Sequence, residues 1–408
     1  MNYITDIAII GGGASGLVAA ITAKRENPSL SVLVFEGLER VGKKLITTGN
    51  GRCNITNKNL DITHFHGENT GFCGYAFKHF GYQEFQKFFG SIGVDFVAEN
   101  DKVYPASLQA SSVVDALRFE CERLGVQTVL NCKIKDLIIK EKFILHSDND
   151  TITARSVIIA TGLFSGGEKV GSDGSFFRLM KNMGFSTIKA TPSLVQLKTE
   201  TEYVKQLKGI KVDANATLLR DNKPFCSYTD EVLFCDYGLS GPAILQISRQ
   251  TARDEHNYSV SLDLYPDTDI KALANSLKSR AKLLSDRTLE NFFVGSLNKR
   301  LGQVVLKYSG FALMDRVDTL TDKDYEKLAY NLKNFSFKVI SNTGFLNSQV
   351  TAGGLSVENF DNKTMMSKKY PRLFAVGEIL DIDGDCGGFN LSWAWSSGII
   401  AGKAAASL

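Results

Sequence analysis

Runs of apolar, β-forming residues alternate with helix-compatible segments in the first part of the chain. Such runs occupy residues 5–10, 31–35 and 156–160, and helical periodicity follows the first of them. Near-continuous apolar runs of this length are typical of buried strands in a parallel sheet. The pattern predicts a βαβ-based α/β domain over residues 1–191.

Further elements of this domain lie between these runs. Aromatic residues spaced three and four apart over residues 71–89 favour an amphipathic helix whose aromatic face is core. Another helix is predicted from Ser111 to Gly125, which is a C-cap signal. Strands are predicted as a pair within residues 96–104, and singly at 126–130, 134–139, 143–146 and 151–154.

From residue 192 the chain changes to short β-type segments, followed by helical periodicity rich in Lys, Leu and Glu. The first pattern returns with an apolar run at residues 371–378 and an Ala/Ser/Gly-rich helix over residues 391–406. Because these last elements complete the sheet domain, the middle of the chain is predicted to be an insertion. The expected division is a nucleotide-binding domain at 1–191 and 346–408, an inserted β-barrel domain at 192–267 and 334–345, and a helical subdomain at 268–333.

The turn after the first apolar run has the spacing Gly-x-Gly-x-x-Gly. In dinucleotide-binding folds the first glycine, here Gly11, allows a tight turn, and the second, Gly13, lets a pyrophosphate approach the backbone. The third, Gly16, allows the helix to pack close to the strand. The helix N-terminus, with Ala14 and Ser15, is then expected to face the phosphates.

The second apolar run ends in a carboxylate. Glu36 lies 20 residues after Gly16, where the motif expects an acid to accept the ribose hydroxyls, and Gly37 follows it. An acid at this position disfavours a 2′-phosphate. Strand, turn, helix and carboxylate together predict dinucleotide binding rather than an ordinary tight turn.

A loop rich in cations, hydroxyls and glycines follows over residues 40–54. Its cations suit a pyrophosphate, and its glycines allow backbone N–H groups to approach a flat polar ring. The alternative is a solvated basic loop. The predicted cofactor-binding residues of this loop are Arg40, Lys43, Lys44, Thr48, Gly49, Asn50, Gly51, Arg52 and Asn54.

The third apolar run ends at the carboxyl edge of the predicted sheet, where such folds place their ligands. Ala160, Thr161 and Gly162 are therefore candidates for cofactor contact. The segment at 134–139 is expected at the sheet edge near the nucleotide, and this position makes the backbone of Ile134 a candidate for adenine contact.

The closing segment is rich in glycine and carboxylates. Glu378 has the position at which FAD folds bond the ribityl hydroxyls, with Asp381 and Asp383 as rivals. The helix that begins near residue 390 is expected to point its N-terminus at the flavin pyrimidine edge, where negative charge develops on reduction. The predicted cofactor-binding residues here are Gly377, Glu378, Asp383, Gly388, Asn390 and Leu391.

Metal-binding patterns are weak in this chain. Aspartates at 381, 383 and 385 have the spacing of a calcium loop, but the glutamate expected near its end is missing, so no metal is predicted. His64 and His66 are the one close histidine pair, in a segment that is more typical of a surface loop. Seven cysteines without a Cys-x-x-Cys pair predict reduced thiols.

Composition limits the class of protein. Among 408 residues the formal net charge is +3, which gives no argument for binding nucleic acid or an anionic membrane. No apolar run approaches the roughly 18 residues of a membrane span. The first strand begins within a few residues of Met1 and leaves no room for a secretory signal, so a cytoplasmic protein is expected.

Five stretches of the chain resemble the BaiN/RdsA-like FAD-dependent oxidoreductases, some of which are labelled aminoacetone oxidases. The blocks T-G-x-G-R-C-N and D-G-D-C-G-G-[FY]-N are more specific than the glycine turn, and the similarity extends over essentially the whole chain. After Gly162 the chain departs from the family pattern, with Leu-Phe-Ser-Gly-Gly in place of Gly-x-Ser-x-Pro. The five stretches are residues 11–16, 43–54 (KKLITTGNGRCN), 237–245 (YGLSGPAIL), 349–354 (QVTAGG) and 377–402.

The resemblance implies a GR2-type flavoprotein: a Rossmann-like FAD-binding domain interrupted by a β-barrel with a helical subdomain, and an active site between them. It implies hydride transfer between a small organic substrate and flavin N5. Two alternatives are an NAD(P)H-dependent flavin reductase of an enone or steroid-like substrate, and a non-catalytic flavin- or nucleotide-binding protein. The electron partner stays open between O2, a quinone and NAD(P)H. Also open are the natural substrate, the catalytic acid or base, the oligomeric state and any redox role of Cys53 or Cys386.

Overall fold

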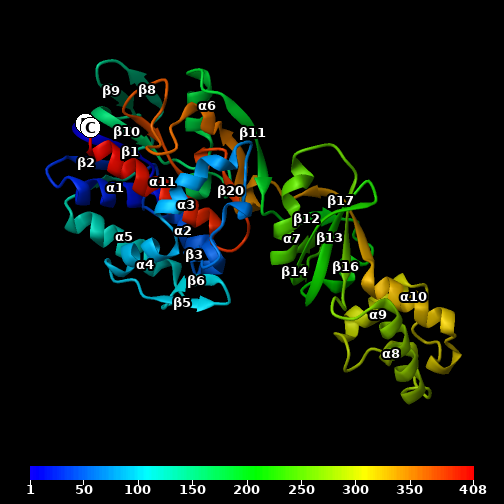
Figure 1. Ribbon diagram of the computed structural model, residues 1–408. Coiled ribbons are helices and arrows are strands. Elements are labelled where there is room, and N and C mark those ends of the chain that lie inside the picture. Colours follow the sequence, from blue (N-terminus) through cyan, green and yellow to red (C-terminus); the bar gives the residue numbers. More distant parts are fainter. The chain divides into compact units, whose positions relative to one another are not determined.

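A computed structural model describes the whole chain, residues 1–408, as two compact units. The first unit comprises Met1–Pro192 and Gln349–Leu408, and the second comprises Ser193–Ser348. Figure 1 shows the blue N-terminal and red C-terminal segments within the same unit. The chain therefore leaves the first unit once and returns to complete it.

A seven-stranded mixed sheet forms the centre of the first unit. Its strands are β1 (Asn2–Ile10), β2 (Val32–Phe35), β7 (Gln127–Val129), β8 (Asp136–Ile139), β9 (Phe143–His146), β10 (Thr151–Ile159) and β19 (Leu373–Ala375). The order is β7-β2-β1-β10-β9-β8, with β19 also paired to β10. Strands β7, β2, β1, β10 and β19 pair in parallel, whereas β8 and β9 add an antiparallel edge. The parallel part is a Rossmann-type sheet.

Strand β10 is one strand where the sequence predicts two. Its first half pairs with β9, from Thr151 to Ala154, and its second half pairs with β19, from Val157 to Ile159. On its other side it pairs with β1 along almost its whole length. The change of partner within one strand explains the two separate apolar patterns.

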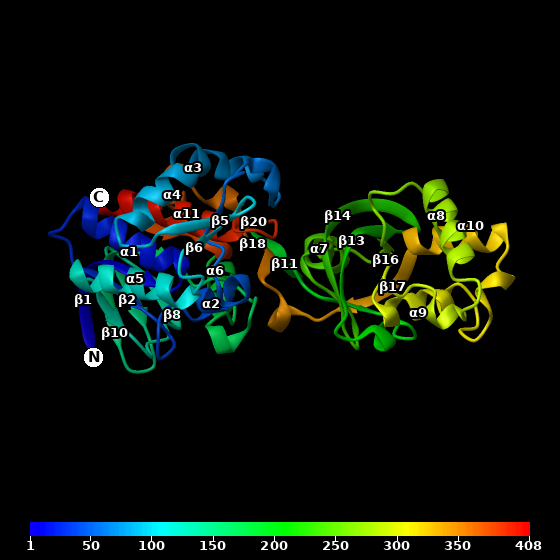
Figure 2. The same ribbon diagram turned by 90° about the horizontal axis from the view of Figure 1, so that it is seen from below.

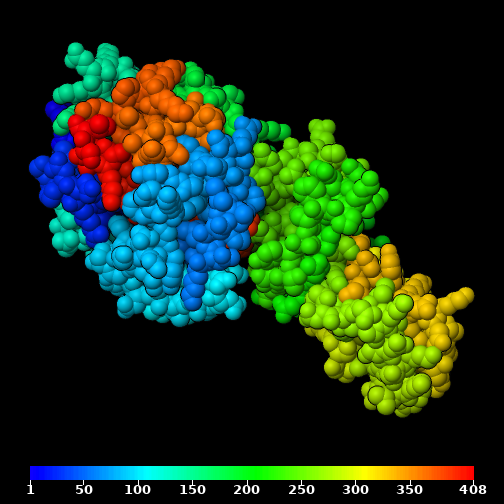
Figure 3. Space-filling view, viewed as in Figure 1, coloured from blue at the N-terminus to red at the C-terminus, as the bar shows by residue number.

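The C-terminal helix α11 (Phe389–Ala406) packs against α1 (Ala14–Glu26), and Figures 1 and 2 both show the two helices side by side. A Cβ on Gly398 would lie 2.5 Å from the carbonyl oxygen of Ser15, and one on Gly402 would lie 2.5 Å from that of Ala19. The small residues of α11 therefore let the two backbones approach closely. Figure 3 shows only part of the red C-terminal segment at the surface on that face.

The remaining helices of the first unit are α2 (Lys43–Thr47), α3 (Gly74–His79), α4 (Tyr82–Gly90), α5 (Ala110–Arg123) and α6 (Ser175–Asn182). The single helix expected over residues 71–89 is divided, because the chain leaves helical geometry at Phe80 and Gly81 before α4 begins. Helix α4 buries Phe85 and Phe89, whereas the aromatic residues of α3, Tyr75 and Phe77, are half-buried.

Three small sheets join distant segments of the chain. They are β3 (Thr56–Asn57) with β6 (Lys102–Pro105) and β5 (Phe96–Glu99), β4 (Phe65–His66) with β20 (Asp383–Gly384), and β11 (Thr187–Ser193) with β18 (Val350–Leu355). The pairing of β4 with β20 brings the segment after the glycine-rich loop against the closing segment.

The second unit is a closed six-stranded barrel with helices. The barrel contains β12 (Leu197–Thr199), β13 (Lys211–Arg220), β14 (Lys223–Phe234), β15 (Gly238–Ser240), β16 (Tyr258–Asp263) and β17 (Phe335–Asn342), and the helices are α7 (Pro242–Ile247), α8 (Ile270–Leu283), α9 (Lys299–Tyr308) and α10 (Asp322–Lys333). The rings of Phe234, Phe335 and Phe337 pack together in its core. None of the helices in the chain has the length and apolar character that crossing a membrane requires.

Candidate cofactor site

The turn between β1 and α1 leaves open space at one glycine and none at the other two. Gly11 has φ +104°, and a Cβ there would lie 2.5 Å from the carbonyl oxygen of Ala160. A Cβ on Gly16 would lie 2.0 Å from the carbonyl oxygen of Gly11, whereas one on Gly13 would have no neighbour within 4 Å. Open space therefore lies at the N-terminus of α1, where unpaired N–H groups and the helix dipole favour a phosphate.

Glu36 follows β2, and backbone groups hold its carboxylate in place. Gly12 N–H donates to Oε2 at 2.8 Å, and Leu38 N–H donates to Oε1 at 2.9 Å. Burial raises the pKa of Glu36 against the effect of these hydrogen bonds. Each oxygen has a second lone pair, so the carboxylate can also accept a ribose hydroxyl. Gly37 next to it is exposed.

Only one of the four predicted cations in the loop reaches the closing segment. Lys44 pairs with Glu378, whereas Lys43 pairs with Glu39 on its own loop at 2.8 Å. Arg52 forms an ion pair with Glu99, and its guanidinium lies over the ring of Tyr104 at 4.2 Å. The fourth predicted cation of the loop, Arg40, is exposed.

Left-handed backbone runs through the middle of this loop. Gly49, Asn50, Gly51 and Cys53 have φ of 57°, 55°, 83° and 59°. The first three are exposed. Thr48 closes the turn because its carbonyl accepts from Cys53 N–H at 3.0 Å. Left-handed geometry is costly for Cys, whereas Asn tolerates it, and strained conformations of this kind concentrate at ligand sites.

Glu378 is the centre of a network that joins three separate segments. Its Oε1 accepts from the Ser165 hydroxyl and from Thr351 N–H, the latter at 3.0 Å, and its Oε2 accepts from Lys44. Lys44 also donates to the Ser165 hydroxyl at 2.5 Å. Ser165 stands where the family pattern Gly-x-Ser-x-Pro also has serine, so the departure at Leu163 and Gly167 leaves this partner of the predicted ribityl-binding acid in place. A carboxylate has about four acceptor sites, and three are used.

The N-terminus of α11 lies against the end of the glycine-rich loop. Gly388 has φ +100°, and a Cβ there would lie 2.6 Å from the backbone of Thr56 and 2.8 Å from Asn54 Oδ1. Asn54 is 9% exposed, and its Oδ1 is buried without a hydrogen-bond partner. Such an atom is costly unless something else donates to it. The flavin pyrimidine ring carries an N–H donor, so this acceptor beside a helix N-terminus fits the group that the resemblance implies.

Asn390 uses its side chain within the closing loop rather than toward a ligand. Its Oδ1 accepts from Gly384 N–H at 2.8 Å, and its Nδ2 donates to the carbonyl oxygens of Gly384 and Asp385 at 2.8 and 3.3 Å. This leaves its backbone N–H, at the start of α11, for contact with a cofactor.

The other predicted residues lie on the same sheet edge or around it. Ala160 N–H donates to Ile10 O at 2.8 Å, and Gly162 beyond it has φ +63°. The first residue of the closing turn, Gly377, packs on Ser15 of α1 and has no room for a Cβ. Ile134 and Asp383 are buried, whereas Ala14, Thr161 and Leu391 are half-buried.

The structure assembles one cluster that the sequence analysis missed. His64 Nδ1 donates to Asp385 Oδ2 at 3.0 Å, and His66 Nε2 donates to Asp385 Oδ1 at 2.7 Å. The i, i+2 spacing of the histidines was the signal in the sequence; in the structure His64 ends a short 3-10 helix and His66 lies in β4. Among residues 1–408, no group of three or more His, Cys, Asp or Glu side chains has a geometry that could hold a metal ion.

Burial raises the pKa of the Cys53 thiol to about 12, so this thiol is protonated at neutral pH. A thiolate is the reactive form of cysteine. Cys386 is half-buried.

Comparison with known proteins establishes the family. The sequence model described as "HI0933-like protein Rossmann domain" matches residues 5–404. The chain belongs to this family. A relative from Clostridium scindens, named 3-dehydro-bile acid delta(4,6)-reductase, is 34% identical over 404 residues, which is 98% of each chain. A relative from Haemophilus influenzae, named ribosomal RNA dihydrouridine synthase, is 26% identical over 97% of each chain.

Solved structures agree with the fold. The 3-ketosteroid-delta4-(5alpha)-dehydrogenase of Rhodococcus jostii aligns with a TM-score of 0.51 and 14% identity, covering 99% of this chain and 97% of that one. The HI0933-like family comprises FAD-dependent oxidoreductases, so the Rossmann-type domain, the oxidoreductase class and the resemblance predicted from sequence are confirmed.

Proposed function

We propose that the first unit binds FAD and that the protein reduces a carbon–carbon double bond conjugated with a ketone. The observation that supports FAD binding most is the convergence of three segments on Glu378, which brings the loop at 40–54 and the closing segment to the same unit as the β1–α1 turn. When bound, FAD supplies hydride transfer at N5.

Each part of the site has a distinct task in this proposal. The open space at Gly13 receives the pyrophosphate at the N-terminus of α1, and Glu36 accepts the ribose hydroxyls. Glu378, with its remaining acceptor site, orients the ribityl chain. The N-terminus of α11 stabilises negative charge on the pyrimidine edge, and Asn54 Oδ1 accepts from the ring N–H.

The direction of the reaction follows from what the names of two relatives share. A 3-dehydro, delta(4,6) compound has a ketone conjugated with its double bonds. Dihydrouridine differs from uridine by saturation of a double bond conjugated with a carbonyl. Both are reductions that add a hydride to one carbon and a proton to its neighbour. The name of the relative at 34% identity favours a steroid-like enone as the substrate. A reduction needs an electron donor, and among O2, a quinone and NAD(P)H it is NAD(P)H that donates a hydride to a flavin.

A second candidate substrate is uridine in RNA, because the relative from Haemophilus influenzae is named for ribosomal RNA. The formal net charge of +3 gives no support for RNA binding, so it stays an outcome of the test.

The test follows flavin absorbance under anaerobic conditions. The purified protein is expected to carry a yellow chromophore that NADH or NADPH bleaches. Addition of a 4,6-dien-3-one bile acid should restore the oxidised spectrum, whereas the saturated 3-ketone of the same skeleton, as control, should not. Restoration by a uridine-containing rRNA fragment alone would favour the second candidate. Bleaching of the oxidised enzyme by aminoacetone would contradict the reductive direction.

A further inference from the structure

The His64–Asp385–His66 cluster has an arrangement suited to proton delivery. A carboxylate only accepts hydrogen bonds, so both histidines donate to Asp385 through one ring nitrogen each. For His64 this nitrogen is Nδ1, which leaves the outer nitrogen, Nε2, with no partner among residues 1–408. A carboxylate on Nδ1 that orients a histidine whose Nε2 moves the proton is a recurrent catalytic geometry.

The His64 ring is fixed from several directions. It stacks on the ring of Phe389 at 4.3 Å with an interplanar angle of 23°. Asp385 N–H donates to the carbonyl oxygen of His64 at 2.9 Å, so the backbone is tied to the same residue as the ring. The imidazole is 29% exposed, so solvent can restore its proton.

Asp385 is itself held in the loop between β20 and α11. The Asn390 side chain bonds the carbonyl oxygen of Asp385, and β20 pairs with β4 immediately before it. The cluster therefore joins β4 and the residue before it to the loop that leads into the helix N-terminus proposed to hold the flavin ring. The titratable groups around the His64 ring are Asp385, His66 and Asp61.

We infer that His64 Nε2 delivers the proton of the double-bond reduction, with Asp385 as the positioning residue; this inference rests on the proposed function. The hydride comes from the reduced cofactor, which is oxidised by two electrons, and forms a C–H bond at the β-carbon. The π electrons of the C=C bond form the second C–H bond at the α-carbon with the proton from the imidazolium. The neutral imidazole then regains a proton from water.

The first test determines which nitrogen of the His64 ring carries the proton, and it uses the flavin-free protein. Nitrogen-15 NMR shifts of a neutral histidine report which ring nitrogen carries the proton. We expect His64 to carry it on Nδ1, because Asp385 accepts there, and we expect Asp385→Asn to remove this preference. A His64 ring protonated on Nε2 in the wild-type protein would overturn the inference.

The second test uses rapid mixing to measure two half-reactions separately: reduction of the enzyme by NAD(P)H, and its reoxidation by the dienone, which requires the proton. Reoxidation of the reduced enzyme by the dienone should be about 100-fold slower or more in His64→Gln, a typical loss for a general acid, while reduction by NAD(P)H stays within twofold of wild type. Added imidazole should partly rescue His64→Ala.

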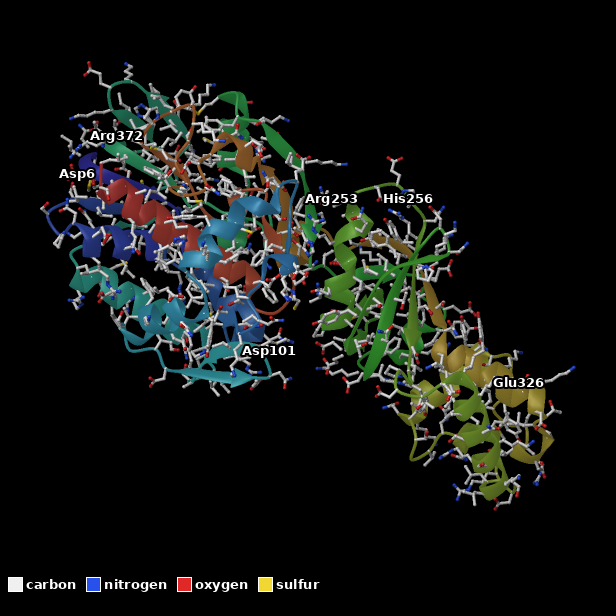
Figure 4. All side chains as sticks on the ribbon, in the orientation of Figure 1. Asp6, Asp101, Arg253, His256, Glu326 and Arg372 are labelled. Atoms are coloured by element: carbon white, nitrogen blue, oxygen red, sulfur yellow. The ribbon has the colours of Figure 1, made fainter.

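A matched control is available in the second unit. His256 Nδ1 lies 2.8 Å from Asp221 Oδ2, and the pair is exposed; His256 is labelled in Figure 4. His256→Gln should leave both half-reactions unchanged. Reoxidation of His64→Gln within twofold of wild type would overturn the inference alone, whereas a wild-type enzyme that no enone reoxidises would overturn the proposed function and the inference with it.

Discussion

Lys44 and Glu378, which are 334 positions apart in the sequence, form an ion pair inside the first unit. The pair joins the glycine-rich loop to the segment that follows β19, so the two ends of the chain are connected at the proposed cofactor site. It also means that Lys44, predicted to face a pyrophosphate, has a carboxylate as its partner. The network with Ser165 makes the orientation of Glu378 depend on Lys44.

We expect Lys44→Met to reduce flavin retention because it leaves the partly buried Glu378 without its cation. The free energy of unfolding should fall by about 1 to 3 kcal/mol, the usual effect of losing a hydrogen bond to a charged group. The flavin-to-protein absorbance ratio and urea unfolding measure the two effects. The double variant K44M/E378Q should recover part of the stability, and strictly additive losses would argue against the coupling.

Two glycines of the same turn are expected to respond differently to substitution. Gly13→Ala should fold with wild-type stability, because a Cβ there meets nothing within 4 Å, but it should weaken FAD binding at least tenfold by entering the pyrophosphate space. Gly16→Ala should destabilise the apoprotein by about 1 to 3 kcal/mol or more, because its Cβ meets the carbonyl oxygen of Gly11. Thermal unfolding without flavin and titration with FAD distinguish the two. Equal FAD affinity for wild type and Gly13→Ala would contradict the proposed phosphate position.

Asn54→Leu should weaken FAD binding without lowering the free energy of unfolding of the flavin-free protein. The variant removes a buried oxygen that has no partner in the protein, so the flavin-free form should be as stable as wild type or about 1 kcal/mol more stable. The FAD-bound form should lose affinity, because the flavin N–H then has no acceptor. Unfolding is measured with and without FAD, and unchanged affinity would show that Asn54 does not contact the ring.

Buried thiols predict how stability depends on alkaline pH. Burial raises the pKa of Cys53, Cys73 and Cys121 to about 12 from an ordinary value of 9.0. The unfolded chain loses these protons above pH 9 while the folded protein keeps them. Each thiol should therefore lower the free energy of unfolding by about 1.4 kcal/mol per pH unit above pH 9. Denaturant unfolding between pH 7 and 11 measures the slope.

Cys53→Ala removes one of these thiols, so the slope above pH 9 should become shallower by about 1.4 kcal/mol per pH unit. The pH dependence of the free energy of unfolding below pH 8 should not change. A slope identical to wild type would mean that Cys53 titrates normally in the folded protein.

Local patterns in the sequence were sufficient for most elements and for the class of the fold, although they joined α3 and α4 into one helix and divided β10 into two strands. The apolar runs of β1, β2 and β10, the glycine turn before α1 and the return of strand β19 and helix α11 all follow from periodicity and turn chemistry, which depend on neighbouring residues. Even the two patterns within β10 were visible, although the sequence could not show that β9 and β19 share one strand.

The partners of the polar side chains were decided only by the tertiary structure. Lys44 with Glu378, and Asp385 with His64 and His66, are pairs whose members lie more than 300 positions apart. Ion pairs and hydrogen bonds depend on distance and direction in space, and neither is encoded in the spacing of such residues along the chain. The sequence alone therefore favoured a surface loop for the histidines, whereas the pairing of β4 with β20 brings them to a carboxylate in the loop before α11.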